Sequence, residues 1–493
     1  MKIVLALNSY KLLQKGVNTD MKNMTLAKIA MACGGTYYGT EADKEKEIAG
    51  AVIDNRLIEK DYLFIAIKGA RVDGHSFIPA AFEAGALAVL SEHELENPAG
   101  SYILVESCEN AMKKIAKFYR KSLDIKVVGI TGSVGKTSTK EMIASVLAQK
   151  YNVHKTEGNF NNEIGLPLTI FKIRDEHEVA VLEMGISDFG EMHRLAEIAN
   201  PDVCVVTNIG LCHLENLIDR DGILRAKTES FEHLTENGIA VLNGDDDKLC
   251  TKTMVNGRPA VFYGFGKEAK VTDGALEEVS YAEKEIYATD VEASGLTGTK
   301  VVIHINAGDG QEGAFEVEIP IAGEHNVYNA LAAVGVAKEL GLSMEEMKRG
   351  IESVQTIGGR SNLIYRNGVT IIDDCYNANP VSMKASIDVL AKVDGRKIAV
   401  LGDMGELGAD EKKLHFSVGE HFAQKGIDRL FCTGELSAEI VSGVVSVSPN
   451  TVVHYFETKE ALIKELKEEC KEGDTILVKA SHFMNFPEIV KAL

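Results

Sequence analysis

The chain of 493 residues lacks several features that would define its class. No apolar run approaches the roughly 20 residues that a membrane-spanning helix needs, so we expect no insertion into a membrane. Its eight cysteines include no CxxC pair, which argues against a zinc site and against a disulfide framework. It also contains no low-complexity segment and no short-period repeat. A globular protein in a reducing compartment fits these absences, and we expect the cytoplasm.

Basic residues are also scarce relative to acidic ones, 53 against 73, and the formal net charge is −20. We therefore expect no nucleic-acid partner, and any phosphate ligand must be bound by a local basic pocket. The length predicts about three domains, each with its own core. The first residues contain only a short apolar stretch and no small-residue cleavage site, so we take 1–23 as an N-terminal extension.

The alternation of strand-like and helix-like segments predicts an α/β fold with three domains. In residues 24–124 short apolar strand-like segments alternate with alanine-rich segments, and this pattern predicts a small α/β domain. Residues 125–356 predict a central parallel sheet, which is broken at 285–322 by an alternating pattern typical of an antiparallel patch. Residues 357–493 repeat strand and helix and predict a doubly wound, Rossmann-like domain.

A glycine-rich segment, KVVGITGSVGKTSTK at 126–140, joins a β-branched strand to a helix. Backbone N–H groups at such a turn can bind phosphates, a lysine neutralises their charge, and a threonine hydroxyl can bind Mg²⁺. The common phosphate loop has a glycine where Ile130 stands, so a plain glycine turn is the alternative. The predicted nucleotide loop consists of Gly132, Ser133, Val134, Gly135, Lys136, Thr137 and Ser138.

Three further polar residues follow the next elements of the central domain. Glu183 ends the strand-like segment VAVLEM, at the sheet edge where α/β proteins bind ligands. His213 and Lys227 come later in the chain. Taken singly, Glu183 could be a solvated strand end, a lone histidine is more often a structural residue than a ligand, and Lys227 looks like a surface helix lysine.

Their ordered combination resembles the ATP-dependent Mur ligases of peptidoglycan synthesis over essentially all of residues 24–493. TGSVGKT is similar to the nucleotide loop of that family, and EGNFNNEIGLPLT at 157–169 to the substrate-side segment after it. LEMG and the later NIG and HLE resemble the family's metal-binding strand ends. GEHNVYNALAA at 323–333 resembles an adenine-binding turn, and DDCYNANP at 373–380 a third-domain loop that closes on ATP.

The resemblance implies ATP, two Mg²⁺ ions and a carbamylated lysine as cofactors. It implies Lys136, Lys227 and His213 as catalytic residues, with Thr137 and Glu183 binding one metal ion and His213 and Lys227 the other. Carbamylation of Lys227 is implied because an ammonium group cannot bind a cation. The further nucleotide-binding residues it implies are Asn326, Asn329, Arg360 and Asp374. The implied substrate-binding residues are Asn55, Arg56, Asn161, Asn162, Asn377 and Asn379.

Within the family, YNANP followed by VLGDMGELG and LHFSVG implies two substrates, UDP-N-acetylmuramoyl-tripeptide and D-alanyl-D-alanine, joined through an acyl phosphate. The products would be ADP, phosphate and the UDP-N-acetylmuramoyl-pentapeptide. No DNPR motif for a diamino acid occurs. The sequence departs from the family pattern at Asn55, at Val381 and in the segment KASH at 479–482. We expect a monomer.

Three alternatives remain open at this point. The chain could be another Mur ligase, or an amide ligase that resembles folylpolyglutamate synthase. It could also be a non-catalytic regulator that binds ATP.

Overall fold

The computed structural model describes residues 20–272, 279–306 and 312–493. The chain divides into two compact units. The first contains the residues up to 126 together with His154–Leu182 and Glu197–Asn200. The second contains Val127–Val153, Glu183–Ala196 and Pro201–Leu493. The predicted domain boundaries at 124 and 356 stay predictions.

The first unit contains a five-stranded sheet of order β1-β5-β4-β3-β2. Its strands are β1 (Thr36–Tyr38), β2 (Gly50–Val52), β3 (Tyr62–Ile65), β4 (Ala88–Ser91) and β5 (Ser101–Leu104). Only β1 pairs in the antiparallel sense. The helical segments are α2 (Leu26–Cys33), α3 (Glu41–Lys44), η1 (Asn55–Leu57), η2 (Gly74–Phe77), α4 (Ile78–Glu83), α5 (Cys108–Ser122) and α7 (Gly165–Ile170).

A nine-stranded sheet has the order β18-β17-β16-β13-β10-β9-β6-β8-β7. Its strands are β6 (Lys126–Thr131), β7 (Val153–Lys155), β8 (Val179–Glu183), β9 (Val203–Val206), β10 (Ile239–Asn243), β13 (Val261–Phe265), β16 (Ile286–Ala293), β17 (Thr299–Asn306) and β18 (Glu312–Ile319). The pairs from β6 through β9, β10 and β13 to β16 are parallel. β16, β17 and β18 pair antiparallel, so the predicted antiparallel patch is confirmed.

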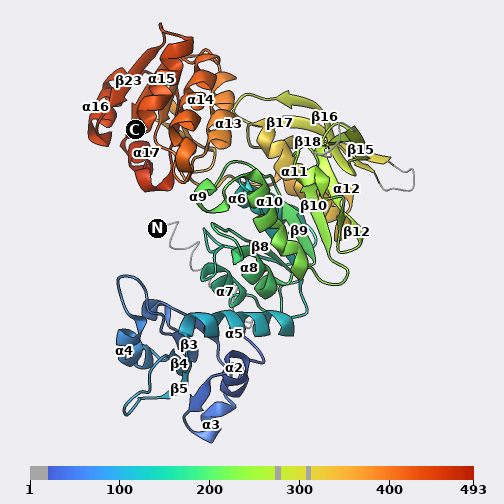
Figure 1. Cartoon of the computed structure of the whole chain (residues 1–493), viewed down its shortest axis with the longest axis vertical. Coiled ribbons are helices and arrows are strands. Elements are labelled where there is room, and N and C mark those ends of the chain that lie inside the picture. The colour runs from blue at the N-terminus through green and yellow to red at the C-terminus, as the bar shows by residue number, and fades with distance from the viewer. Residues whose placement is uncertain (1–19, 273–278, 307–311) are drawn as a thin grey trace, which may run out of the picture. The chain divides into compact units, whose positions relative to one another are not determined.

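Helices and short ladders complete this part of the chain. The helices are α6 (Lys136–Leu147), α8 (Glu191–Ala199), α9 (Leu214–Leu217), α10 (Arg220–Thr228), η3 (Glu229–His233), η4 (Leu249–Thr251), α11 (Glu324–Glu339) and α12 (Met344–Glu352). The ladders pair β11 (Met254–Val255) with β12 (Arg258–Pro259), and β14 (Glu268–Thr272) with β15 (Val279–Glu283). Helix α11 packs against α6, which begins at the nucleotide loop (Figure 1).

The C-terminal part of the second unit contains a six-stranded sheet of order β19-β20-β24-β21-β22-β23. Its strands are β19 (Asn362–Arg366), β20 (Val369–Asp373), β21 (Lys397–Leu401), β22 (Arg429–Thr433), β23 (Val452–Phe456) and β24 (Thr475–Lys479). Its helices are α13 (Pro380–Ala391), η5 (Gly408–Asp410), α14 (Glu411–Ala423), α15 (Ser437–Val447), α16 (Lys459–Glu469), η6 (His482–Met484) and α17 (Pro487–Ala492). The predicted α/β class is confirmed.

Strand β19 was missing from the sequence prediction. It pairs antiparallel with β20 across the two-residue turn Asn367–Gly368. Both turn residues have a positive φ, 52° and 79°, which is the conformation that a tight hairpin of matching twist requires. The edge of the otherwise parallel sheet is therefore a local hairpin.

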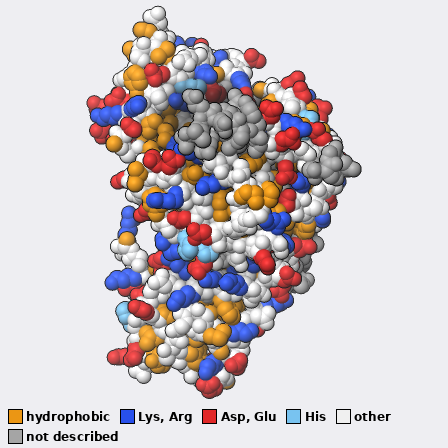
Figure 2. Space-filling view, turned by 45° about the vertical axis from the view of Figure 1, so that its right-hand side comes forward, with side chains coloured by type: hydrophobic (Ala, Val, Ile, Leu, Met, Phe, Trp, Pro, Cys, Tyr) orange, Lys and Arg blue, Asp and Glu red, His pale blue; other side chains and the backbone are white. Residues whose placement is uncertain are grey.

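The surface mixes charges of both signs. Figure 2 shows acidic and basic side chains interspersed across the face that it draws. Across the described ranges, none of the helices combines the length and apolarity needed to cross a bilayer.

Helices α14 and α15 approach each other closely through glycine (Figure 1). A Cβ atom on Gly419 of α14 would lie 2.0 Å from the Ile440 carbonyl oxygen, and one on Gly443 of α15 would lie 2.2 Å from the Phe416 carbonyl oxygen. Any larger residue must separate the two backbones, since a backbone carbonyl cannot rotate away as a side chain can.

We predict that Gly419→Ala lowers the free energy of unfolding by about 1–3 kcal/mol, because it overpacks this contact. The measurement is chemical denaturation, with Gly358→Ala as the control because no atom lies within 4 Å of a Cβ built there. The control should stay within about 0.5 kcal/mol of the parent. A stabilised Gly419→Ala protein, as helix propensity alone would give, would contradict the close contact.

Candidate active site

The nucleotide loop begins where β6 ends, at Thr131, and finishes where α6 begins, at Lys136. Gly132 has a φ of 146°, and a Cβ atom built on it would lie 1.9 Å from Thr207 Oγ1. Gly135 has a φ of 82° and is the N-cap residue of α6. Glycine is therefore required at both ends of the turn, by close approach at Gly132 and by conformation at both positions.

The end of β9 holds the middle of this loop. The Asn208 side chain accepts a hydrogen bond from Val134 N at 3.1 Å and donates one to Val134 O at 3.1 Å. The Thr207 hydroxyl donates to the same carbonyl oxygen at 2.6 Å, and Ser133 N donates to Asn208 O at 3.0 Å. Both backbone polar groups of Val134 are thus bound within the protein, and the loop has a fixed shape.

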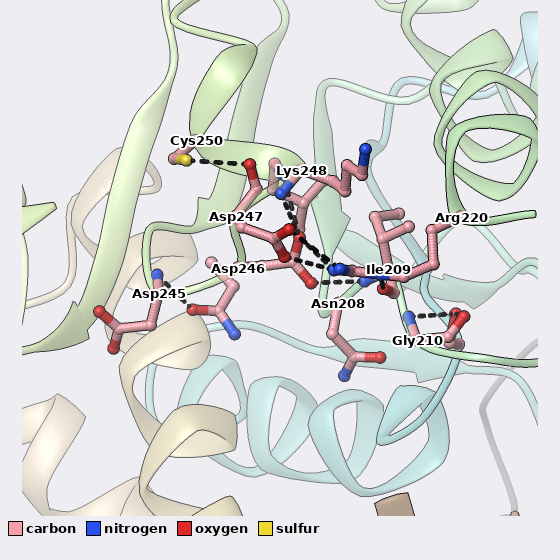
Figure 3. A network of polar contacts seen from close by, with 12 residues as sticks. Asn208, Ile209, Gly210, Arg220, Asp245, Asp246, Asp247, Lys248 and Cys250 are labelled. Carbon is pink, nitrogen blue, oxygen red and sulfur yellow. Dashed lines mark hydrogen bonds and ion pairs between the residues drawn. The ribbon is translucent and has the colours of Figure 1, made fainter. Parts of the chain in front are cut away.

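The segment after β9 is held from its other side by the loop that follows β10 (Figure 3). The carboxylate of Asp246 accepts hydrogen bonds from Ile209 N at 2.7 Å and from the amides of Lys248 and Leu249 at 3.0 Å each. Arg220 donates to Ile209 O at 2.8 Å and pairs with Asp247. Burial raises the pKa of Asp246 above its usual value. This network fixes the strand end that in turn fixes the nucleotide loop.

The start of α6 has backbone amides that are available as hydrogen-bond donors to a ligand. Within the described residues, no acceptor is found for the backbone amides of Gly135, Lys136, Thr137 and Ser138. These groups lie at the positive end of a helix dipole, which favours an anion. The Lys136 ammonium donates to Gly132 O at 2.7 Å, so it lies over the same turn. The geometry fits a bound phosphate.

Thr137 and Glu183 form a buried pair of oxygen ligands. The Thr137 hydroxyl donates to Glu183 Oε2 at 2.9 Å, and the two residues are 4% and 2% exposed. Hydroxyl and carboxylate oxygens beside a phosphate site are the ligands that Mg²⁺ prefers. The residues present therefore fit the first predicted metal ion.

Lys227 lies in α10 and is only 1% exposed, so its interpretation as a surface helix lysine is wrong. Burial lowers its pKa to about 8, while nearby Cys212 raises it and nearby Lys136 lowers it further. No carboxylate of the described part of the chain forms an ion pair with it. A buried, unpaired lysine costs stability, which is the pattern of a functional rather than a structural residue.

His213 has a φ of 51° and caps α9. Its Nδ1 atom lies 2.7 Å from Glu406 Oε2, and this contact lowers the pKa of Glu406 below its usual value. Sequence reasoning missed Glu406, which also has a positive φ of 62°. A candidate metal ligand is thus paired with a carboxylate from the C-terminal part of the same unit.

The expected adenine-binding turn at 323–333 is a helix rather than a turn, because α11 begins at Glu324 directly after Gly323. Asn329 accepts from the Thr139 hydroxyl at 2.8 Å and donates to Asn326 at 2.9 Å. Both asparagines are buried and connect α11 to α6. Asn326 also lines a small pocket with Ser138 and Arg360, which brings three predicted nucleotide residues together.

The loop at 373–380 is tied to the strands around it. Lys479 Nζ lies 2.6 Å from Asp374 Oδ2, and the Ser386 hydroxyl donates to the same carboxylate at 2.5 Å. The Arg360 guanidinium lies 4.1 Å from the centre of the Tyr376 ring. Asn377 accepts from Ala378 N, and Asn379 forms a capping box with Ser382 at the start of α13. The side chain of Asn379 therefore has a structural role already.

The remaining predicted substrate residues belong to the first unit. Arg56 is paired with Asp54, which lowers the pKa of that carboxyl to about 2, and Asn55 begins η1. Asn162 accepts from the amides of Ile164 and Gly165 at the start of α7, and Asn161 lies beside it in the chain. Their roles in substrate binding stay predictions.

Family models match most of the chain. The Mur ligase middle domain matches residues 130–337, the glutamate ligase domain of Mur ligases matches 359–482, and the catalytic domain of the Mur ligase family matches 47–122. The chain belongs to the Mur ligase family. The resemblance identified from the motifs is thereby confirmed.

Among Mur ligases, the chain is 40% identical to UDP-N-acetylmuramoyl-tripeptide--D-alanyl-D-alanine ligase of Bacillus subtilis, across 96% of this chain and 99% of that protein. It is similar to MurF of Acinetobacter baumannii, with a TM-score of 0.83 and 29% identity over 96% and 99% of the two chains. It also resembles MurF of Thermotoga maritima in complex with ADP, with a TM-score of 0.75 and 31% identity over 90% and 96%.

We predict that Thr137→Val weakens ADP binding at least about tenfold when Mg²⁺ is present, because a hydroxyl ligand is replaced by a methyl group of similar size. Isothermal titration calorimetry measures the dissociation constant of ADP for each variant. Thr137→Ser, which keeps the hydroxyl, should bind within about threefold of the parent. Equal losses in the two variants would contradict a role for the hydroxyl in metal binding.

Proposed function

We propose that this chain is an ATP-dependent ligase that joins D-alanyl-D-alanine to the tripeptide carboxylate of UDP-N-acetylmuramoyl-tripeptide. The observation that carries the proposal is the 40% identity to the Bacillus subtilis ligase of that name over nearly the whole of both chains. The nucleotide loop, the Thr137–Glu183 pair and buried Lys227 supply a site whose chemistry agrees with it.

The reaction needs an activated carboxylate, since a carboxylate itself is a poor electrophile. An oxygen of the tripeptide carboxylate attacks the γ-phosphorus of ATP, the bond to the bridging oxygen breaks, and ADP leaves. The amine of D-alanyl-D-alanine then attacks the acyl carbon and loses a proton, and phosphate leaves as the amide forms. The products are ADP, phosphate and UDP-N-acetylmuramoyl-pentapeptide.

The residues of the loop stabilise the charge that develops on the phosphate. Free amides at the start of α6 and the Lys136 ammonium face the position of the phosphate chain. Thr137 and Glu183 would hold a Mg²⁺ ion, which supplies charge neutralisation when it is bound.

Lys227 would hold the second Mg²⁺ ion together with His213 only after carbamylation. An ammonium group repels a cation, whereas a carbamate offers oxygen ligands. Formation of a carbamate requires the neutral amine, and a pKa of about 8 keeps a larger fraction neutral at physiological pH than the usual value of 10.5 would. Burial of the side chain thus favours the modification that the proposed role needs.

We also propose a cellular compartment, an oligomeric state and a set of partners. The eight cysteines all have free thiols, which agrees with a reducing cytoplasm. We propose a monomer with two small-molecule substrates and no nucleic-acid partner.

The proposed function predicts that ADP release requires both substrates together. A coupled assay should give full turnover with ATP, the UDP-muramyl tripeptide and D-alanyl-D-alanine. Omission of either substrate should reduce the rate to background. Turnover with a folate and glutamate would favour a folylpolyglutamate synthase, and nucleotide binding without any substrate-dependent turnover would favour a regulator.

The carbamate proposal predicts that Lys227→Ala is nearly inactive and that formate or acetate partly restores it. The added carboxylate can occupy the cavity left by the side chain and provide the missing oxygen ligands. The same acids should not restore Lys136→Ala, whose lost group is a cation. A Lys227→Ala enzyme with parental ADP release would end the proposal.

A further inference from the structure

Two histidines and a glutamate form a cluster that the ligase reaction does not use. His193 lies in α8, and Glu232 and His233 lie at the end of η3, all within the second unit. The His193 and Glu232 side chains are 48% and 62% exposed, so an ion from solution can reach them. No phosphate-loop residue takes part in the cluster.

The distances within the cluster match those between the ligands of one metal ion. His193 Nδ1 lies 3.0 Å from Glu232 Oε2 and 3.2 Å from His233 Nε2. Ligand atoms bound tetrahedrally to Zn²⁺ at about 2.0–2.1 Å lie about 3.3 Å apart. The ligand atoms of the three residues all lie within 4.8 Å of one another, so rotation of the side chains can bring them around one ion.

One ring nitrogen of His193 is shared between two partners. The Nδ1 atom of His193 carries either one proton or one lone pair, yet it faces a carboxylate oxygen and a second imidazole nitrogen at once. A cation can interact with all three donor atoms together. Imidazole and carboxylate ligands in a set of three suit Zn²⁺ and related ions, with water as the fourth ligand.

Side-chain contacts outside the cluster already hold the two elements in position. The Glu229 carboxylate accepts from Gly190 N at 3.1 Å and from His193 N at 3.2 Å, which joins the start of α8 to η3. The Arg225 guanidinium of α10 lies 4.2 Å from the centre of the Phe189 ring, so the helix before η3 also contacts the segment before α8. A preorganised frame lowers the cost of binding an ion.

We propose that His193, Glu232 and His233 bind one divalent transition-metal ion of the zinc type, separate from the two Mg²⁺ ions of the ligase reaction. The ion links α8 to η3, and η3 follows α10 directly after Thr228. Because all three ligands are absent from the nucleotide loop, the site is independent of the proposed function.

The test uses Co²⁺ as a spectroscopic substitute for Zn²⁺, added to the full chain in excess Mg²⁺ without nucleotide. The expected result is one equivalent of Co²⁺ with the intense visible absorption of tetrahedral cobalt, which Zn²⁺ displaces. Zn²⁺ should also raise the thermal unfolding midpoint of the parent. His193→Ala and His233→Ala should each weaken Co²⁺ binding at least about a hundredfold.

Two controls separate this site from others. His421 is a partly exposed histidine outside the cluster, and its Nε2 atom lies 2.8 Å from Asp388 Oδ1. The variant His421→Ala should bind Co²⁺ like the parent. Thr137→Val should also keep the cobalt absorption, because it changes only the Mg²⁺ site. Glu232→Gln should weaken binding while keeping the circular dichroism of the parent. Absence of tetrahedral absorption in the parent, or equal binding by His193→Ala and His421→Ala, would overturn the proposal.

Discussion

The hydrogen bonds between the Asn208 side chain and the Val134 backbone are the interaction on which the rest of the site depends. They satisfy both backbone polar groups of this residue at the centre of the nucleotide loop, and the Thr207 hydroxyl adds a second bond to the carbonyl oxygen. The loop cannot turn its own peptide groups elsewhere without leaving these partners buried and unpaired. The amides at the start of α6 consequently remain directed to a ligand.

The negative net charge of the protein makes a fixed nucleotide loop useful. The proposed function requires a protein of net charge −20 to bind a nucleotide and a UDP-sugar, which are both polyanions. In the proposed reaction Lys136 would supply local positive charge, and Lys227, once carbamylated, would supply ligands for a metal ion. Burial of the Lys227 ammonium lowers its pKa, and nearby Lys136 lowers it further.

Much of the fold follows from the sequence because its signals are local. The alternating pattern at 285–322 predicts an antiparallel patch, and the pairing of β16 with β17 and of β17 with β18 confirms it. Asn326 and Asn329 show the limit: their motif resembled a turn, yet the segment continues as a helix because its apolar residues pack against α6. The burial of Lys227 and the contact between His213 and Glu406 depend on segments far apart in the chain, which no local pattern records.

Hydrogen exchange at the amides of Ser133 and Val134, measured by NMR on the protein without nucleotide, tests the central claim most directly. Both amides have acceptors on Asn208, so we expect slow exchange before any ligand is added. Exchange as fast as in an unstructured peptide, slowed only after ADP and Mg²⁺ are bound, would show that the nucleotide shapes the loop and would contradict an anchor supplied by the strand end.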